Sequence, residues 1–181
     1  MNKKVIAAMS LTVAAACMLS DSTQAQTAKA DTKRISSSYA VAETEQQYIE
    51  IERTKYKCEW LDTELSQGEY ELMCRLVFCE SGNQEMETQY MVALTVLNRL
   101  SSNLFPETIK EVIYAPYAYE VTTWDGFEKY GYTEQVERAV KMALAENRYA
   151  SDMFYFRTLH YHDFGVPYLQ SGDLYFSKEQ A

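Results

Sequence analysis

The sequence predicts an α+β domain in which helices dominate and a small sheet comes last. Four segments carry apolar residues at helical spacing, whereas the C-terminal part contains short β-prone runs. Helices followed by strands is an order typical of an α+β domain. With 47% hydrophobic residues among 181, the chain can bury a core of ordinary size. The expected helices are 69–80, 85–100, 106–114 and 133–147, and the expected β-prone runs, which would form a hairpin or small sheet, are 153–157 and 174–176.

The chain begins with the features of a secretory signal peptide over residues 1–30. Lys3 and Lys4 precede an alanine-rich apolar stretch, and small residues typical of a cleavage site follow at 23–25 and at 28–30. An alternative is a lipoprotein signal, in which Cys17 would carry a lipid anchor. Either signal predicts an exported protein.

Residues 31–66 are expected to form a linker or N-terminal arm. The stretch 31–38 is polar and typical of a solvated linker. Residues 48–60 mix charged and aromatic side chains, and a strand, a short helix and a partner-binding arm all remain open. The folded domain is expected to span residues 67–181.

A clear break separates the first two expected helices. Gly68 precedes the first helix, and Ser81, Gly82 and Asn83 end it. Asn83 is expected to cap the second helix. The apolar stripe of that helix recurs every three or four residues, at Met86, Tyr90, Ala93, Leu94, Leu97 and Leu100.

The third helix is expected to start with Pro106 at its first position, and the fourth to be capped by Thr133. Between these two helices, residues 115–131 are rich in aromatic side chains, and Pro116 and Gly126 argue against regular structure. Long loops of this kind are often functional, although they also fold over a core.

Glu80 is the residue on which the functional interpretation depends. At about 100° per residue, Glu71 and Arg75 share a polar stripe on the first helix, and Glu80 projects to the opposite, apolar side. Burying an ionised carboxylate is costly, so we expect a raised pKa for Glu80, as a general acid requires. The alternative is a carboxylate at a frayed helix end that turns out to water.

The charge balance argues against two classes of partner. The formal net charge is −9, so an exported chain of this composition is a poor candidate for binding nucleic acid, and anionic lipid surfaces would repel it. After the first segment, no apolar run is long enough for a membrane span.

Cysteine and histidine do not predict a second kind of site. Three cysteines follow the signal, and Cys58 with Cys74 or Cys79 allows one disulfide, while none is also open. His160 and His162 lack the clustered spacing of a zinc site with Cys79. A thiol at the C-terminal end of a helix has a raised pKa, which disfavours a Cys–His nucleophile. We expect no metal and no cofactor.

Short motifs follow one another in a fixed order over residues 68–178. They begin with Glu80-Ser-Gly-Asn-Gln84, Glu87-Thr-Gln89, Val92-Ala and Val96-Leu-Asn-Arg99. They continue with Phe105-Pro106, Thr108-Ile109, Val112-Ile113-Tyr114, Pro116 and Asp125-Gly126. They end with Tyr155-Phe-Arg-Thr158, Tyr161-His162, Phe164-Gly165, Pro167 and Gly172-Asp-Leu-Tyr-Phe-Ser177. This series resembles the cell wall hydrolase family that includes the spore cortex-lytic enzymes.

The resemblance implies a lysozyme-like, mostly helical catalytic domain that cleaves the glycan strands of peptidoglycan. Together with the expected signal segment, it predicts a protein that is secreted or associated with the cell wall. Members act as lytic transglycosylases or muramidases, and the family's catalytic glutamate falls on Glu80. In a transglycosylase one carboxyl suffices, because it protonates the glycosidic oxygen and then takes the proton of the sugar's own C6 hydroxyl. A hydrolytic muramidase is the alternative. It generally uses a second carboxylate, for which Glu85, Glu87 and Asp125 are candidates.

The resemblance also implies a set of substrate contacts. Gln84 and Gln89 fit the family pattern and are expected to hydrogen-bond around Glu80 or the sugar. The residues expected to stack on sugars, with core packing as the alternative, are Tyr117, Tyr119 and Trp124, and those expected to border the cleft or end a structural hairpin are Tyr161 and His162.

Two positions depart from the family pattern. Many members have a glutamine where this chain has Ala118, and a histidine where it has Leu174. These departures leave room for an altered substrate preference, for weakened activity, or for a catalytically silent protein that binds or assembles the wall. The sequence identifies no protein partner.

Overall fold

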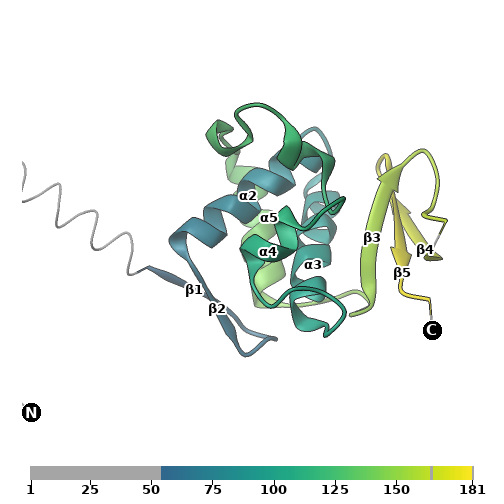
Figure 1. Cartoon of the computed structure of the whole chain (residues 1–181), viewed down its shortest axis with the longest axis horizontal. Helices are drawn as coiled ribbons and strands as arrows, with labels where there is room; N and C mark the ends of the chain where they lie inside the picture. Colours follow the sequence, from purple (N-terminus) through teal and green to yellow (C-terminus); the bar gives the residue numbers. More distant parts are fainter. Residues whose placement is uncertain (1–53, 164, 181) are drawn as a thin grey trace, which may run out of the picture. The chain divides into compact units, whose positions relative to one another are not determined.

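The computed structural model describes residues 54–163 and 165–180, which form an α+β fold dominated by helices (Figure 1). The predicted fold class is confirmed. The helices are α2 (Gln67–Ser81), α3 (Met86–Ser101), α4 (Ile109–Tyr114) and α5 (Glu134–Ala145), with short 3-10 turns η1 (Glu120–Thr123) and η2 (Phe127–Lys129). The strands are β1 (Lys55–Cys58) and β2 (Thr63–Ser66) in one sheet, and β3 (Met153–Thr158), β4 (Val166–Ser171) and β5 (Leu174–Lys178) in another.

The expected signal segment, the lipid anchor at Cys17 and the first part of the expected arm lie outside the described residues. Within the part of the chain that the structure describes, no helix has the length and apolar character needed to cross a membrane.

Helix α3 is the central element of the core. All of residues 88–99 are buried, and the helix contacts α2, α4, α5 and β3. The predicted apolar stripe accounts for one side only, because polar residues of α3 are buried on the other. Asn98 donates from Nδ2 to the backbone oxygens of Ala150 and Met153, at 3.1 Å each. Polar groups of α3 therefore hold the chain that enters β3.

Ser66 and Glu69 form a capping box at the start of α2. The hydroxyl of Ser66 accepts a hydrogen bond from the backbone N of Glu69 at 3.3 Å, and the backbone N of Ser66 donates to the Glu69 carboxylate at 2.9 Å. The pairing satisfies amides that have no partner within the helix. It also starts α2 earlier than residue 69, so that Gly68 lies in the first turn.

Replacing Ser66 removes half of this capping box. We expect Ser66→Ala to lower the free energy of unfolding by about 1 kcal/mol, measured by urea denaturation. Ser151, an exposed serine in a turn, provides the matched control. Equal losses in Ser66→Ala and Ser151→Ala would show that the cap contributes nothing.

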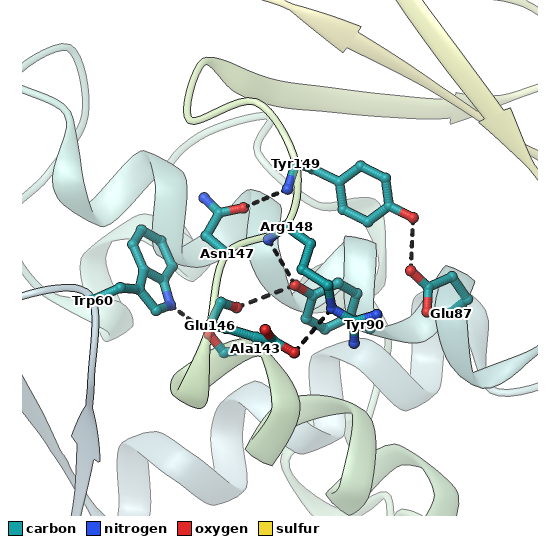
Figure 2. A network of polar contacts seen from close by, with 8 residues as sticks. All are labelled: Trp60, Glu87, Tyr90, Ala143, Glu146, Asn147, Arg148 and Tyr149. Atoms are coloured by element: carbon teal, nitrogen blue, oxygen red, sulfur yellow. Dashed lines mark hydrogen bonds and ion pairs between the residues drawn. The ribbon is translucent and has the colours of Figure 1, made fainter.

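The β1–β2 hairpin packs directly on the helices. Cys58 and Leu65 are buried in the core, and the rings of Tyr56 and Tyr70 stack with 3.8 Å between centroids. Trp60 donates from Nε1 to the backbone oxygen of Ala143 in α5 at 2.7 Å (Figure 2). Of the three possibilities for residues 48–60, the structure has a strand over 55–58. The division into 31–66 and 67–181 stays a prediction, with the hairpin attached to the core.

Two tyrosines fix the connection from α5 to β3. The hydroxyl of Tyr90 donates to the backbone oxygen of Glu146 at 3.1 Å and accepts from the backbone N of Arg148 at 3.0 Å (Figure 2). The hydroxyl of Tyr149 donates to the carboxylate of Glu87 at 2.6 Å. These contacts hold the chain against α3 just before β3 begins.

The C-terminal sheet has three antiparallel strands in the order β3-β5-β4. The predicted runs 153–157 and 174–176 are confirmed as β3 and β5. Strand β4 is not expected from the sequence, because Gly165, Pro167 and Gly172 read as breaks. Pro167 is tolerated because β4 lies at the edge of this sheet, where a strand needs no donor on its outer side. Gly172, with φ of 53°, makes the tight turn into β5.

Two predictions for the starts of helices are wrong: the cap by Asn83 and the position of Pro106. Helix α3 follows Glu85 and has no side-chain cap, since Asn83 instead accepts a hydrogen bond from the Gln84 side chain at 3.3 Å. Helix α4 follows Thr108, whose hydroxyl accepts from the backbone N of Glu111 at 3.2 Å. Pro106 therefore precedes α4. The predicted Thr133 cap of α5 is confirmed.

Candidate active site

A cleft of about 790 Å³ opens beside the C-terminal end of α2. Its walls come from the last turn of α2, the end of α3, the segment from 104 to 124, and strands β3 and β5. The lining residues that bear on the predictions from sequence are Glu80, Arg99, Tyr117, Ala118, Tyr119, Glu120, Trp124, His162 and Leu174.

Glu80 is half-buried in the last turn of α2 and faces this cleft. Burial, and next the charge of the Glu120 carboxylate, raise the pKa of Glu80 to about 7, while the Arg99 guanidinium acts in the opposite direction. The expected rise in pKa is therefore found. A carboxyl group that still holds its proton near neutral pH can serve as a general acid.

Gln89 fixes the turn that directly follows Glu80. Its side chain is fully buried on α3. The Nε2 atom lies within hydrogen-bond distance of three backbone oxygens, those of Ser81 at 3.1 Å, Gly82 at 3.4 Å and Gln84 at 3.2 Å. Carbonyls at a helix end lack partners within the helix. Gln89 therefore does not line the cleft, and it supports Glu80 by holding the backbone of the turn that follows Glu80.

Gln84 joins the same turn to the β4–β5 hairpin. Its side-chain Nε2 donates to the carboxylate of Asp173 at 3.0 Å, and its Oε1 accepts from the backbone N of Asp173 at 3.1 Å. Its own backbone oxygen accepts from Nε2 of Gln135 at 3.1 Å. Gln84 is not among the residues that line the cleft.

The three aromatic residues expected to stack on sugars all line the cleft, but they differ in exposure. Trp124 is 45% exposed and Tyr117 is fully exposed. Tyr117 also has a φ of 63°, which is uncommon for a bulky residue and is retained most often at functional sites. Tyr119 is only 4% exposed. Tyr117 and Trp124 therefore present open ring surface, whereas Tyr119 packs within the wall.

His162 and Tyr161 are neighbours in the sequence but have different surroundings. His162 lines the cleft, with its ring centroid 5.8 Å from that of Tyr155. Burial, and next the charge of Arg157, lower the pKa of His162, so the ring is neutral at pH 7. Tyr161 instead packs edge-on against Tyr175 at 5.2 Å between centroids and does not line the cleft.

Both departures from the family pattern lie in the cleft wall. Ala118 is half-buried and Leu174 is buried, and both contribute lining atoms. At these positions the wall presents apolar groups where many family members would present an amide and an imidazole. The wall is correspondingly poorer in hydrogen-bonding groups.

Glu120 is the second carboxylate of the cleft, and the sequence does not indicate it. It lies in η1 as an exposed residue with no distinctive spacing from Glu80. The three candidates that the sequence offers for this role do not line the cleft. They are Glu85 at the start of α3, Glu87 hydrogen-bonded to Tyr149, and Asp125 exposed between η1 and η2.

Removing the charge of Glu120 tests the electrostatic coupling within the cleft. Because the Glu120 carboxylate raises the pKa of Glu80, we expect Glu120→Gln to lower that pKa. An NMR titration of the Glu80 carboxyl carbon measures the change. Glu128→Gln, which removes an exposed carboxylate that accepts a hydrogen bond from Tyr114, is expected to leave it unchanged. An unchanged titration in Glu120→Gln would contradict the coupling.

Arg99 is another cleft residue without an expected role. It is 7% exposed at the end of α3, and its Nε donates to the backbone oxygen of Phe154 at 2.8 Å. Arg99 belongs to the motif Val96-Leu-Asn-Arg99, but the spacing of this motif does not predict that the guanidinium shares a cleft with Glu80.

The cysteines provide no nucleophile at this site. Cys58, Cys74 and Cys79 are all free thiols. Cys79 lines the cleft, but burial, and next the charge of Glu80, raise the pKa of its thiol, which disfavours the reactive thiolate. Within residues 54–163 and 165–180, no three His, Cys, Asp or Glu side chains are grouped so that they could hold a metal ion.

Part of this chain is similar in sequence to known proteins. Residues 83–172 match the model of a family described as Cell Wall Hydrolase. A spore cortex-lytic enzyme of Oceanobacillus iheyensis is 43% identical over 54 residues, which are 30% of this chain and 20% of that protein. The match therefore spans about a fifth of the length of this curated relative.

Two solved structures are similar to the described fold. The catalytic domain of the Bacillus cereus SleB protein matches with a TM-score of 0.55 and 27% identity, covering 62% of this chain and 91% of that one. The catalytic domain of a germination-specific lytic transglycosylase, SleB from Bacillus anthracis, matches with a TM-score of 0.57 and 25% identity, covering 63% and 97%. The predicted family resemblance and the lysozyme-like α+β class are confirmed.

Proposed function

Residues 83–172 match the cell wall hydrolase family, and from this premise we propose that the chain is an exported enzyme that cleaves the glycan strands of peptidoglycan. The reaction proposed is that of a lytic transglycosylase, which cuts the bond between N-acetylmuramic acid and N-acetylglucosamine. Residues 1–30 would act as the signal peptide and residues 67–181 as the catalytic domain, and the enzyme would be secreted or associated with the cell wall. Lipidation at Cys17 is the alternative route to the same surface.

One observation carries the proposal: Glu80 lies in the cleft with a pKa raised to about 7. The protonated carboxyl donates its proton to the glycosidic oxygen as the bond to the muramic C1 breaks. The resulting carboxylate then takes the proton of the C6 hydroxyl of the same sugar, whose oxygen closes a 1,6-anhydro ring on C1. One residue with a pKa near neutrality suits both steps, because neither protonation state is strongly disfavoured.

The cleft wall supports a polymer of sugars as the ligand. Tyr117 and Trp124 are exposed aromatic rings on the cleft, and such rings combine an apolar face with a polar edge. We assign them to sugar contact, with His162 as a neutral hydrogen-bonding group. Gln84 and Gln89 support the turn after Glu80, and Tyr119 and Tyr161 support the wall and the sheet.

Glu120 favours a second candidate function, hydrolysis by water. Retaining and inverting glycosidases generally use two carboxylates flanking the scissile bond, and Glu120 shares the cleft with Glu80. In that case Glu80 would remain the acid, and Glu120 would activate water or stabilise the sugar cation. The two reactions leave different end groups on the muramic residue.

Release of soluble glycan fragments from purified, insoluble peptidoglycan tests the proposal against a binding-only role. We expect the full chain to release fragments continuously over time. A protein that co-sediments with the insoluble wall but releases no fragments would be a binding or assembly protein, as the Ala118 and Leu174 departures allow. Release without cleavage of the glycan backbone, detected as free peptides alone, would also contradict the proposal.

A further inference from the structure

Arg99 is a buried cation at the wall of the cleft. Among the described residues its side chain forms no salt bridge, and its one hydrogen bond, from Nε to the oxygen of Phe154, involves a neutral group. Burying an uncompensated charge is costly. A fold that retains such a cation at the wall of a cleft indicates that an anion is present there during function.

Three aromatic rings hold the guanidinium in place. Its Cζ lies 4.8 Å from the ring centroid of Tyr119, 5.4 Å from that of Phe105 and 5.9 Å from that of Tyr155. Cation–π contacts of this kind are favourable and are stronger when desolvated. The hydrogen bond from Nε to the oxygen of Phe154 holds the same side chain. Its charge is therefore fixed at the cleft wall before any substrate arrives.

We propose that Arg99 is the charge partner of Glu80, stabilising the carboxylate that Glu80 becomes once its proton has passed to the glycosidic oxygen. This role in the reaction rests on the proposed function. When the glycosidic bond breaks, its electron pair leaves with the protonated oxygen, and Glu80 is left with a negative charge. Arg99 offsets that charge until the C6 hydroxyl returns a proton to Glu80. Arg99 thus acts through Glu80, without touching the sugar.

Other charged and titratable groups interact with Glu80 or Arg99, and a test of this pair must distinguish their effects from the effect of the pair itself. Glu80 interacts with Arg99 and with Glu120. Arg99 also interacts with Tyr119, Tyr155 and His162. Of these last three, only His162 is of a residue type whose ordinary pKa lies within the pH range of such a test. A pH-dependent effect of Arg99 must therefore be shown to depend on Glu80 and not on His162.

A double-mutant cycle in the absence of substrate provides that separation. The variants are Arg99→Met, which keeps a long apolar side chain, Glu80→Gln, and the double variant, compared by urea denaturation at about pH 8.5 and about pH 5. We expect a coupling between the two sites at the higher pH, where Glu80 is ionised, and its loss at the lower pH. Coupling that is absent, or equal at both pH values, would overturn the proposal even if the chain is an active enzyme.

The pH dependence of fragment release provides the second readout. Activity should fall as pH rises and Glu80 loses its proton. Because Arg99 lowers the pKa of Glu80, Arg99→Met should move this alkaline limb upward, by on the order of one pH unit, and reduce the maximal rate. Arg99→Lys, which keeps the charge, should leave the limb near its original position and remains informative if Arg99→Met folds poorly.

Arg157→Met is the matched control, because Arg157 lines the same cleft and its guanidinium is 3.9 Å from Asp163. We expect it to leave the midpoint of the alkaline limb in place. A shift in Arg157→Met equal to that in Arg99→Met would show that any positive charge in the cleft lowers the pKa of Glu80, and it would overturn the pairing. Weaker substrate binding in Arg99→Met with an unchanged limb would also overturn it, since Arg99 would then bind an anionic group of the substrate.

Discussion

Glu80→Gln is expected to reduce the release of glycan fragments by a factor of about 10² to 10⁴, the usual contribution of a general acid or base. The amide keeps the size and shape of the side chain but cannot donate a proton to the glycosidic oxygen. Quantifying soluble muropeptides after digestion of purified peptidoglycan measures the loss. Glu71→Gln, on the same helix but outside the cleft, is the control and should retain activity.

The same variant has an expected effect on stability that does not involve substrate. The pKa of Glu80 is raised on folding, so its stabilising contribution is complete below about pH 4.5 and is lost as pH rises through about 7. Glu80→Gln carries no charge at any pH. It should therefore unfold at a higher temperature than the parent at about pH 8 and at a similar temperature at about pH 4. A difference that does not depend on pH would show that Glu80 is not desolvated in the folded chain.

Gln89→Met is expected to destabilise the fold more than any of the other substitutions, by about 3 kcal/mol in the free energy of unfolding. Methionine fills a similar volume but donates no hydrogen bond. The backbone oxygens of Ser81, Gly82 and Gln84 would lose the donor that they share, and lost hydrogen bonds to buried acceptors are costly. The oxygens of Ser81 and Gln84 keep one other donor each, the backbone N of Gln84 and Nε2 of Gln135. Urea denaturation measures this loss.

Activity should fall in Gln89→Met as well, because the turn that follows Glu80 would no longer be held. Gln135→Met is the matched control, since Gln135 donates only to the oxygen of Gln84 and is half-buried. Its cost should be less than about 1.5 kcal/mol, as for one ordinary hydrogen bond. If Gln89→Met is no more destabilising than Gln135→Met, the proposed support of the Glu80 turn is wrong.

The sequence predicts the helical framework well because burial repeats at helical spacing there. The apolar stripe from Met86 to Leu100 identifies α3, and the expected cap at Thr133 is observed for α5. Helix starts are less accessible, since they depend on which side chain reaches which amide. Thr108 and not Pro106 starts α4, and Ser66 starts α2 through its pairing with Glu69.

Strand β4 shows where local signals mislead. Pro167 between two glycines reads as a loop, yet an edge strand tolerates a proline because one of its sides has no neighbouring strand. The hydrogen bonds that anchor the β4–β5 turn come from Gln84, nearly ninety residues away in the sequence. A contact at this distance leaves no periodic trace from which to predict it.

The candidate site is also predictable from the sequence only in part. The direction of Glu80 follows from helical geometry, and its raised pKa follows from the apolar face to which it points. Glu120 and Arg99 enter the cleft from η1 and from the end of α3, and only the tertiary arrangement brings them to Glu80. Tyr119 also shows this limit, because its position in an aromatic segment does not distinguish an exposed ring from a buried one.

Digestion of peptidoglycan in water enriched in oxygen-18, followed by mass spectrometry of the fragment ends, tests the central claim most directly. If Glu80 directs the sugar's own C6 hydroxyl to C1, the new muramic ends will be 1,6-anhydro rings without oxygen-18. Reducing muramic ends that carry oxygen-18 would contradict this mechanism and show that water completes the reaction.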